Sequence, residues 1–189
     1  RWSLDLDFII RDRLYDEYDE GRLRFKPRIG RQLGLYWTLF TGLSLERVDV
    51  TNLQENVPLP PDLIAQEAAG KQNFNSVILD ASYRDLDSRL NPRDGESFQV
   101  YNSFYTDALG SDAEFYKVEA NYERYWVMGD ETTDVKPGWK FSAGGGLAMP
   151  YGASDDVPYT ERFFLGGFRT LRGFEFRGVG PNVGDTAIG

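Results

Sequence analysis

Hydrophobic and polar residues alternate with a period of two along most of the chain, in runs of roughly ten residues separated by turn signals. In the first run, residues 2–11, large apolar side chains hold the even positions and polar side chains hold most of the odd ones. Similar runs follow at 22–29, 37–46, 77–84, 98–105, 116–123 and 139–149. Because successive side chains of a strand point to opposite faces, the pattern predicts about seven strands, each with one apolar face. No strand–helix–strand alternation is present, so we expect an all-β, antiparallel sheet.

Turn signals and one helix interrupt the alternation. Gly34 and residues 91–95 are typical of tight turns, and the acidic stretch 16–21 is typical of a loop. Pro27 lies inside a predicted strand and lacks an N–H for the ladder, so we expect a bulge there. The segment 53–75 breaks the pattern. Within it, residues 61–70 have proline near the start, good helix formers inside and glycine at the end, which predicts a short helix in a long loop.

Such a sheet fits either a membrane barrel or a soluble sandwich, and three features favour the membrane. Runs of roughly ten residues match a tilted transmembrane strand better than the five or six residues usual in soluble sheets. The polar faces carry charges along their whole length, as the inner wall of a barrel does. A soluble sheet with one solvated face remains the alternative, because it would look similar strand by strand. The tryptophans lie at or near strand ends, where aromatic girdles would be, and they are Trp2, Trp37, Trp126 and Trp139.

Composition narrows the function classes. The 189 residues include 21 Lys and Arg against 30 Asp and Glu, a formal net charge of −9, which argues against a nucleic-acid partner. The chain has no cysteine and no histidine, which removes disulfides, thiolate sites, serine–histidine triads and nearly all zinc chemistry. An enzyme could still use carboxylates, although its usual proton shuttle near neutral pH is missing, and the composition offers no catalytic, metal or cofactor candidate. No run of eighteen apolar residues marks a transmembrane helix.

Three clusters that could suggest chemistry have simpler interpretations. Asp85 and Asp87 are more consistent with a solvated turn than with an acid–base pair, because nothing nearby in the sequence would perturb their pKa values. The glycine run 144–146 lacks the helix and the Lys-Ser/Thr of a phosphate loop, so it predicts a bend or a close approach within a strand. The basic positions 22, 24, 26 and 28 predict a polar inner face that is balanced by acids on neighbouring strands.

The most specific signal is a glycine- and aromatic-rich stretch near the end of the chain. An Arg-Phe-Phe-x-Gly-Gly segment at 162–167 precedes Leu-Arg-Gly-Phe at 171–174 and Gly-x-Gly-Pro at 178–181. This window resembles the sixth extracellular loop of the Omp85 family of outer-membrane β-barrels, which carries Val-Arg-Gly-Phe/Tyr there. Leu171 in place of valine is a mild departure, and the order of strands from about residue 74 resembles the family as well. The motif residues are Gly166, Gly167, Leu171, Arg172, Gly173, Phe174, Gly180 and Pro181.

The resemblance implies a role for this loop. In the family the loop folds back into the barrel lumen, where the motif arginine and aromatic residue contact the inner wall, so Arg172 and Phe174 are the expected contacts. The family's acidic wall partner lies on a later strand, outside this chain, which leaves Glu119 and Glu123 as weaker candidate partners. The loop either braces the barrel internally or touches substrate directly, and we favour the brace.

The resemblance also implies an architecture. Residues 1–189 are then part of a sixteen-stranded antiparallel barrel, with wall strands in 1–160, the helix-bearing loop at 53–75 and the sixth loop at 161–189. Periplasmic POTRA domains and the closing strands would lie outside this chain. From loop lengths, the turn at 91–95 and the connection at 130–137 would be periplasmic, and the loops at 53–75 and 162 onwards extracellular.

The function that the resemblance implies is assembly of outer-membrane proteins, closest to the family's assembly factors. Such a protein inserts unfolded β-barrel clients into outer-membrane lipid, with periplasmic chaperones and accessory lipoproteins as partners, and performs no covalent chemistry. The alternatives within the same family are a translocation-and-assembly protein and a two-partner secretion pore, which have different functions. A passive porin belongs to another class. An outer-membrane hydrolase would need a nucleophile–base pair, which the absence of histidine makes remote.

Overall fold

The computed structural model describes residues 1–189 except 55, 129–137, 169 and 185. Seven long strands form one antiparallel sheet in which each pairs with the next along the chain. They are β1 (Trp2–Leu14), β2 (Asp19–Leu33), β3 (Trp37–Thr51), β5 (Ser76–Leu86), β6 (Gly95–Tyr105), β7 (Phe115–Val127) and β8 (Gly138–Pro150). The predicted antiparallel order is therefore confirmed.

Short elements complete the chain. The two-residue strand β4 (Gln72–Asn73) pairs with β3, while β9 (Asn182–Val183) and β10 (Thr186–Ala187) form a small ribbon of their own. The helices are α1 (Pro61–Ala69) and the 3₁₀ turns η1 (Asp107–Leu109) and η2 (Tyr159–Glu161). Within the described residues, no helix is long and apolar enough to cross a membrane.

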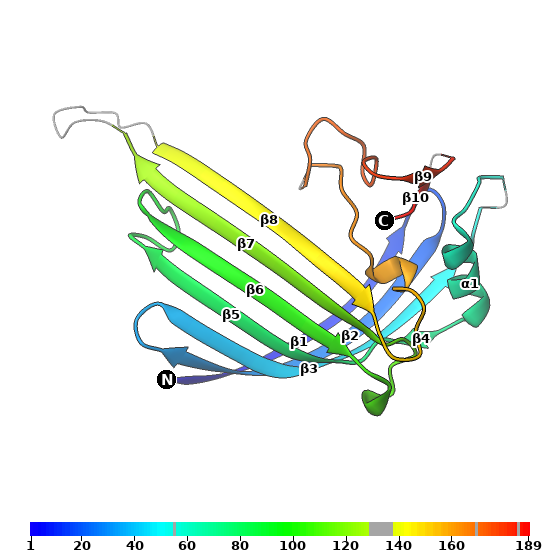
Figure 1. Ribbon diagram of the computed structural model, residues 1–189, viewed down its shortest axis with the longest axis horizontal. Helices are drawn as coiled ribbons and strands as arrows, with labels where there is room; N and C mark the ends of the chain where they lie inside the picture. Colours follow the sequence, from blue (N-terminus) through cyan, green and yellow to red (C-terminus); the bar gives the residue numbers. More distant parts are fainter. Residues whose placement is uncertain (55, 129–137, 169, 185) are drawn as a thin grey trace.

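The sheet is strongly curved, and the chain that follows β8 turns back onto its concave side (Figure 1). The connections β2–β3 and β5–β6 lie at one end of the sheet. At the other end lie α1, η1, the β1–β2 connection and the segment after β8. The loops at 53–75 and after 162 thus share one end and the turn at 91–95 lies at the opposite one, as the predicted sidedness requires. The 130–137 connection lies outside the described residues.

The two faces of the sheet have opposite chemistry. On β1, Trp2, Leu6 and Ile10 are 66, 62 and 71 % exposed on the convex face, and the intervening polar residues are on the concave face. The other long strands repeat this arrangement, so that an apolar band covers the outside. Large apolar side chains that are exposed in a monomer need a partner surface. The alternation read from the sequence therefore places each strand's apolar face outward, as a lipid-facing wall would have it.

The helix in the long loop forms where the sequence predicts it. Pro61 occupies the first turn, where its missing N–H removes no helical hydrogen bond. Gly70 ends the helix with a positive φ of 70°, and its N–H donates to the Glu67 carbonyl at 2.9 Å. Leu63 and Gln66 form its buried face, which points toward the segment after β8.

Two local predictions are wrong. Pairing of β2 with β3 is interrupted at Lys26 and Pro27, but it resumes in the same register, and pairing with β1 runs straight through Pro27. The missing N–H therefore costs ladder bonds on one side only, and no residue is inserted to make a bulge. The acidic stretch 16–21 is only partly a loop, because β2 already begins at Asp19 and pairs there with Leu14.

The buried core is displaced to the α1 end of the sheet. It contains aromatic and aliphatic side chains from the strand ends, from α1 and from the segment after β8. Its members are Tyr18, Val48, Val50, Leu63, Phe74, Tyr105, Phe115, Val157 and Tyr159. The rest of the concave face is charged, so apolar packing is confined to this end and fixes the position of the returning chain.

Candidate functional site

The stem of the returning chain, residues 157–164, is anchored by a buried carboxylate. Glu161 is 3 % exposed and accepts from Arg22 Nη1 at 2.8 Å. The same Arg22 guanidinium contacts Glu46 Oε1 at 2.7 Å and Glu20 Oε1 at 3.0 Å. Lys117 Nζ donates to the Glu161 carbonyl oxygen at 2.8 Å and lies 3.5 Å from its carboxylate. Strands β2 and β7 thus both contact Glu161 of the stem, and Glu46 of β3 contacts the same Arg22.

The charges of this cluster determine the ionisation state of Glu161. Burial alone would raise the pKa of Glu161, but attraction and hydrogen bonds from Lys117 and Arg22 outweigh that effect and hold the pKa below its ordinary value. Glu161 is therefore ionised at neutral pH. Removing one member of such a buried set leaves another charge without a partner. The resulting loss of stability is much larger than the net stabilisation that the intact ion pairs provide.

Phe163 extends the anchor along β8. Its ring lies over Lys117, with Nζ 4.8 Å from the ring centroid, in a cation–π contact. A Cβ at Gly146 would come within 2.4 Å of this ring, so only glycine leaves the space that Phe163 occupies. The close approach predicted for the glycine run at 144–146 is confirmed at this position.

Helix α1 holds the stem from the other side. Gln66 and Thr160 form a buried pair in which the Gln66 amide donates to the Thr160 hydroxyl at 2.8 Å, and the Thr160 N–H donates back at 3.3 Å. The Arg162 guanidinium reaches Asp62 of α1 and Asp156, each at 2.8 Å. It also donates to the carbonyls of Val157 and Ile188, at 2.9 and 3.2 Å. The helix-bearing loop and the stem are therefore one packed unit.

The tip of the returning chain, residues 165–181 apart from 169, contains the motif. Gly166 has a φ of +116°, and a Cβ there would lie 2.3 Å from the Glu175 carbonyl oxygen, so the tight fold requires glycine. Gly167 N–H donates to the Phe174 carbonyl at 3.0 Å, and Leu171 N–H donates to the Gly167 carbonyl at 3.2 Å. Beyond Gly173 and Gly180, the Pro181 carbonyl accepts from Ile188 N–H at 2.9 Å.

The structure does not bring the two predicted contact residues onto the inner wall. Arg172 is exposed and lies over the ring of Phe168, 5.1 Å from its centroid, within the tip itself. Phe174 is 54 % exposed. Among the described residues, Arg172 forms no ion pair with Glu119 or Glu123. Lys140 on the neighbouring strand already neutralises Glu123 at 2.6 Å.

The anchors that the structure does show lie outside the motif. Arg22, Lys117 and Glu161 form the stem anchor, and of these the sequence pattern singles out only Arg22, as one of the basic series at 22, 24, 26 and 28. The balance expected for that series is present, since Arg22 contacts three glutamates and Arg28 pairs with Asp5 and Asp80. Glu161 could have been singled out as a lone carboxylate between aromatic residues directly before the motif.

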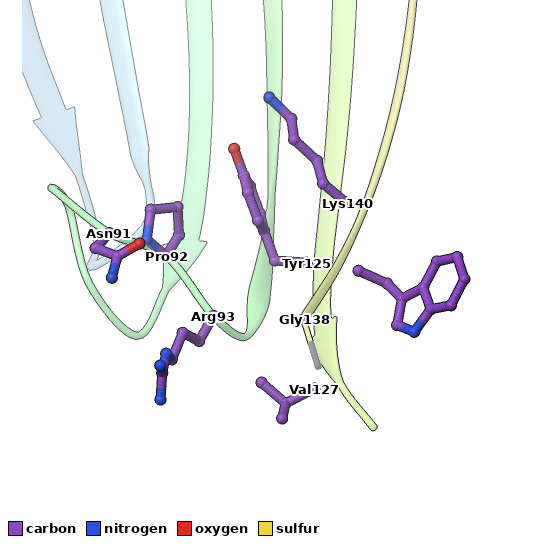
Figure 2. A pocket seen from close by; sticks show the side chains of 8 residues that line it. Asn91, Pro92, Arg93, Tyr125, Val127, Gly138 and Lys140 are labelled. Atoms are coloured by element: carbon purple, nitrogen blue, oxygen red, sulfur yellow. The ribbon is translucent and has the colours of Figure 1, made fainter. Parts of the chain in front are cut away.

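A second concave feature lies at the opposite end of the sheet. A pocket of about 320 Å³ is lined by the 91–93 turn and by the adjoining ends of β7 and β8. Figure 2 shows Tyr125 and Lys140 extending in the same direction, with Arg93 on the far side of the turn. Lys140 lies 5.4 Å from the Tyr125 ring centroid and is ion-paired with Glu123, so its charge is already compensated.

The turn beside this pocket corrects one expectation. Asp87 accepts N–H bonds from Arg93 at 2.9 Å and from Asp94 at 3.2 Å, and these bonds lower the pKa of its carboxyl group. The turn itself therefore perturbs Asp87, whereas the sequence suggested that nothing nearby would. Asp87 closes the turn as a structural acceptor, which agrees with the interpretation that it performs no acid–base work.

Comparison with known proteins decides the family. The chain matches the Omp85 superfamily domain over residues 1–189. It belongs to the Omp85 superfamily. A curated relative, the outer membrane protein assembly factor BamA of Nitratidesulfovibrio vulgaris, is 27 % identical over 180 residues, which are 95 % of this chain and 21 % of that protein. The chain thus spans about a fifth of the length of this relative.

A solved structure agrees with the fold of this Omp85 chain. The crystal structure of BamA from Haemophilus ducreyi lacking POTRA domains 1–3 superimposes with a TM-score of 0.67 at 18 % identity, covering 95 % of this chain and 35 % of that one. The chain is accordingly part of an outer-membrane β-barrel, and the seven long strands are a portion of its wall. In such a barrel the apolar outer face meets lipid, so we expect the convex face to be the one in contact with it.

Proposed function

We propose that this Omp85 chain is the central wall of an insertase that folds and inserts β-barrel proteins into the outer membrane. The observation that supports the proposal most directly is the stem locked onto the inner wall through Glu161, Arg22 and Lys117. The name of the N. vulgaris relative, an assembly factor, points the same way.

In this proposal the work is physical and involves no covalent step or cofactor. A client strand that enters lipid unpaired exposes N–H and C=O groups at a cost of several kcal/mol each. The barrel lowers that barrier at its wall, while the docked stem and α1 keep the remaining wall rigid. The proposed partners are outer-membrane lipid, unfolded β-barrel clients, periplasmic chaperones and accessory lipoproteins, and POTRA domains would precede the barrel.

The test uses the full-length protein in liposomes of outer-membrane lipid. Urea-unfolded client barrel is added, and its folding is followed by heat-modifiable migration on gels and by protease protection. We expect faster folding than with empty liposomes, and slower folding with the Glu161→Ala protein than with wild type. Glu175→Ala is the matched control, because Glu175 is an exposed tip glutamate without an ion pair among the described residues.

Other results would support the alternatives. Passage of a secreted substrate into the liposomes without accelerated client folding would indicate a translocation or two-partner secretion protein. Steady small-solute conductance without either activity would indicate a passive porin. Either result would refute the insertase proposal and leave membership of the Omp85 superfamily unchanged.

A further inference from the structure

Arg177 lies at the centre of an aromatic cage that joins three separate segments. Its guanidinium carbon is 4.0 Å from the ring centroid of Phe164 and 4.3 Å from that of Tyr15. Its Nη1 donates to the Tyr18 hydroxyl at 2.8 Å. The rings of Tyr18, Tyr159 and Phe176 lie 5.8, 5.8 and 5.5 Å away. All five centroids are within the range of cation–π attraction.

The cage connects elements that are distant in the sequence. Tyr15 and Tyr18 belong to the β1–β2 connection, Tyr159 and Phe164 to the stem, and Phe176 to the tip. Tyr15 stacks on Phe176 with centroids 6.0 Å apart, and Tyr159 meets Phe164 at 5.2 Å. One guanidinium therefore links the tip both to the wall strands and to the anchored stem.

The backbone of Arg177 indicates that these contacts hold it under strain. Its φ is +59°, in the left-handed region that residues other than glycine, asparagine and aspartate rarely adopt. Such a conformation persists only where the surroundings compensate for it. Arg172 of the same tip is exposed and lies over the ring of Phe168.

We propose that Arg177 positions the tip against the β1–β2 connection, and we call this set of contacts the latch. Release of the cage frees the tip, residues 165–181, while the stem stays docked through Glu161. Arg177 is thus a positioning residue. Any effect of the latch on client insertion rests on the proposed function, whereas the latch itself does not.

The test is hydrogen–deuterium exchange on the full-length protein in lipid nanodiscs. The reporter is the peptide at 165–181, in which Gly167 and Val179 N–H donate to Phe174 and Leu165 carbonyls. The variant is Arg177→Asn, since asparagine tolerates the left-handed backbone but cannot fill the cage. We expect exchange of this peptide to rise on the order of tenfold, as for loss of a desolvated cation–π and charged hydrogen-bond anchor. The peptide at 158–163 should not change.

The matched control is Glu175→Ala, an exposed residue of the same tip, which should leave both peptides unchanged. Unchanged exchange in Arg177→Asn would overturn the latch, and so would equal acceleration by Glu175→Ala. If Arg177→Asn does not fold, Tyr18→Phe is the deciding variant, because it removes only the hydroxyl acceptor. It should accelerate exchange of the peptide at 165–181 by roughly threefold. Unchanged exchange of this peptide would refute the proposal. Client folding is measured separately, so that an exchange response without insertase activity contradicts only the proposed function.

Discussion

At the scale of single residues, one buried carboxylate holds the returning chain in place. Glu161 lies 139 positions from Arg22 in the sequence, yet the two side chains meet at 2.8 Å. Lys117 of β7 adds a second cation beside Arg22 of β2. A buried set of paired charges stabilises the fold only weakly, but loss of one member destabilises it strongly. We therefore expect the protein to be sensitive to substitution of Glu161.

Replacing Glu161 by alanine should therefore undock the stem. Arg22 would keep Glu20 and Glu46, but Lys117 would lose its only ion-pair partner among the described residues. We expect a loss of about 3–5 kcal/mol in the free energy of unfolding, measured in urea with the full-length protein in lipid. Glu175→Ala should change it by less than about 0.5 kcal/mol. Equal effects of the two variants would contradict the role of Glu161.

The same residue predicts a pH dependence. The folded-state pKa of Glu161 is lowered, so its contribution to stability is complete above the ordinary glutamate pKa of about 4.3. That contribution is lost as pH falls through the lower folded-state pKa. The protection factor at 158–163, which corrects exchange for its intrinsic pH dependence, should stay high at pH 5 and fall steeply only below about pH 4. Glu161→Gln should flatten the part of this profile that Glu161 causes, and an unchanged profile would show that Glu161 does not cause it.

At the scale of elements, the strands could be predicted and their contacts with the returning chain could not. Alternation over residues 2–11 requires only local sequence, because a strand's faces follow from its period of two. The helix at 61–69 likewise follows from a proline and a glycine at its ends. The pairing of Gln66 with Thr160 spans 94 residues, and no local pattern contains that information.

The wrong predictions have the same origin. Pro27 breaks a local rule, but the uninterrupted ladder with β1 keeps the register without a bulge. The expected wall contact of Arg172 is not among these errors and stays a prediction, because the family's acidic wall partner lies on a later strand, outside this chain. Arg177 gives no motif signal, and its cage exists only when residues 15–18, 159–164 and 176 come together. The contacts of the site therefore form only in the tertiary structure, and no local sequence pattern predicts them.

Strand β8 offers a test of how closely the stem fits the wall. Gly146 lies under the Phe163 ring, whereas a Cβ at Gly145 would meet nothing within 4 Å. Gly146→Ala should displace Phe163 from Lys117 and destabilise the protein by about 1–3 kcal/mol, as overpacking does. Gly145→Ala should be neutral or slightly stabilising, since it removes backbone freedom from the unfolded chain. Urea unfolding in lipid measures both, and a harmless Gly146→Ala would show that the ring has room to move.

At the scale of the whole molecule, the two faces of the sheet differ in chemistry and have different roles. The convex face is apolar, as a face in contact with lipid would be, and the concave face is charged and receives the returning chain. The core is concentrated at the α1 end, so stability there comes from packing between loops as well as from the ladder. Substitutions on the two faces of one strand should consequently have very different effects.

Adjacent residues in the middle of β7 allow this comparison with the same substitution. Ala120 lies on the outward face with Tyr116 and Tyr122, and Asn121 lies on the inward face between Glu119 and Glu123. Ala120→Arg should destabilise the full-length barrel by about 2–4 kcal/mol, because it places a cation in hydrocarbon.

Asn121→Arg should change the unfolding free energy by less than about 1 kcal/mol, because the two glutamates compensate the new charge. Reversible urea unfolding in bilayers measures both variants side by side. Equal destabilisation would mean that the two faces of β7 see the same environment, which is incompatible with a membrane wall. A large effect confined to Ala120→Arg would identify the convex face as the one in contact with lipid.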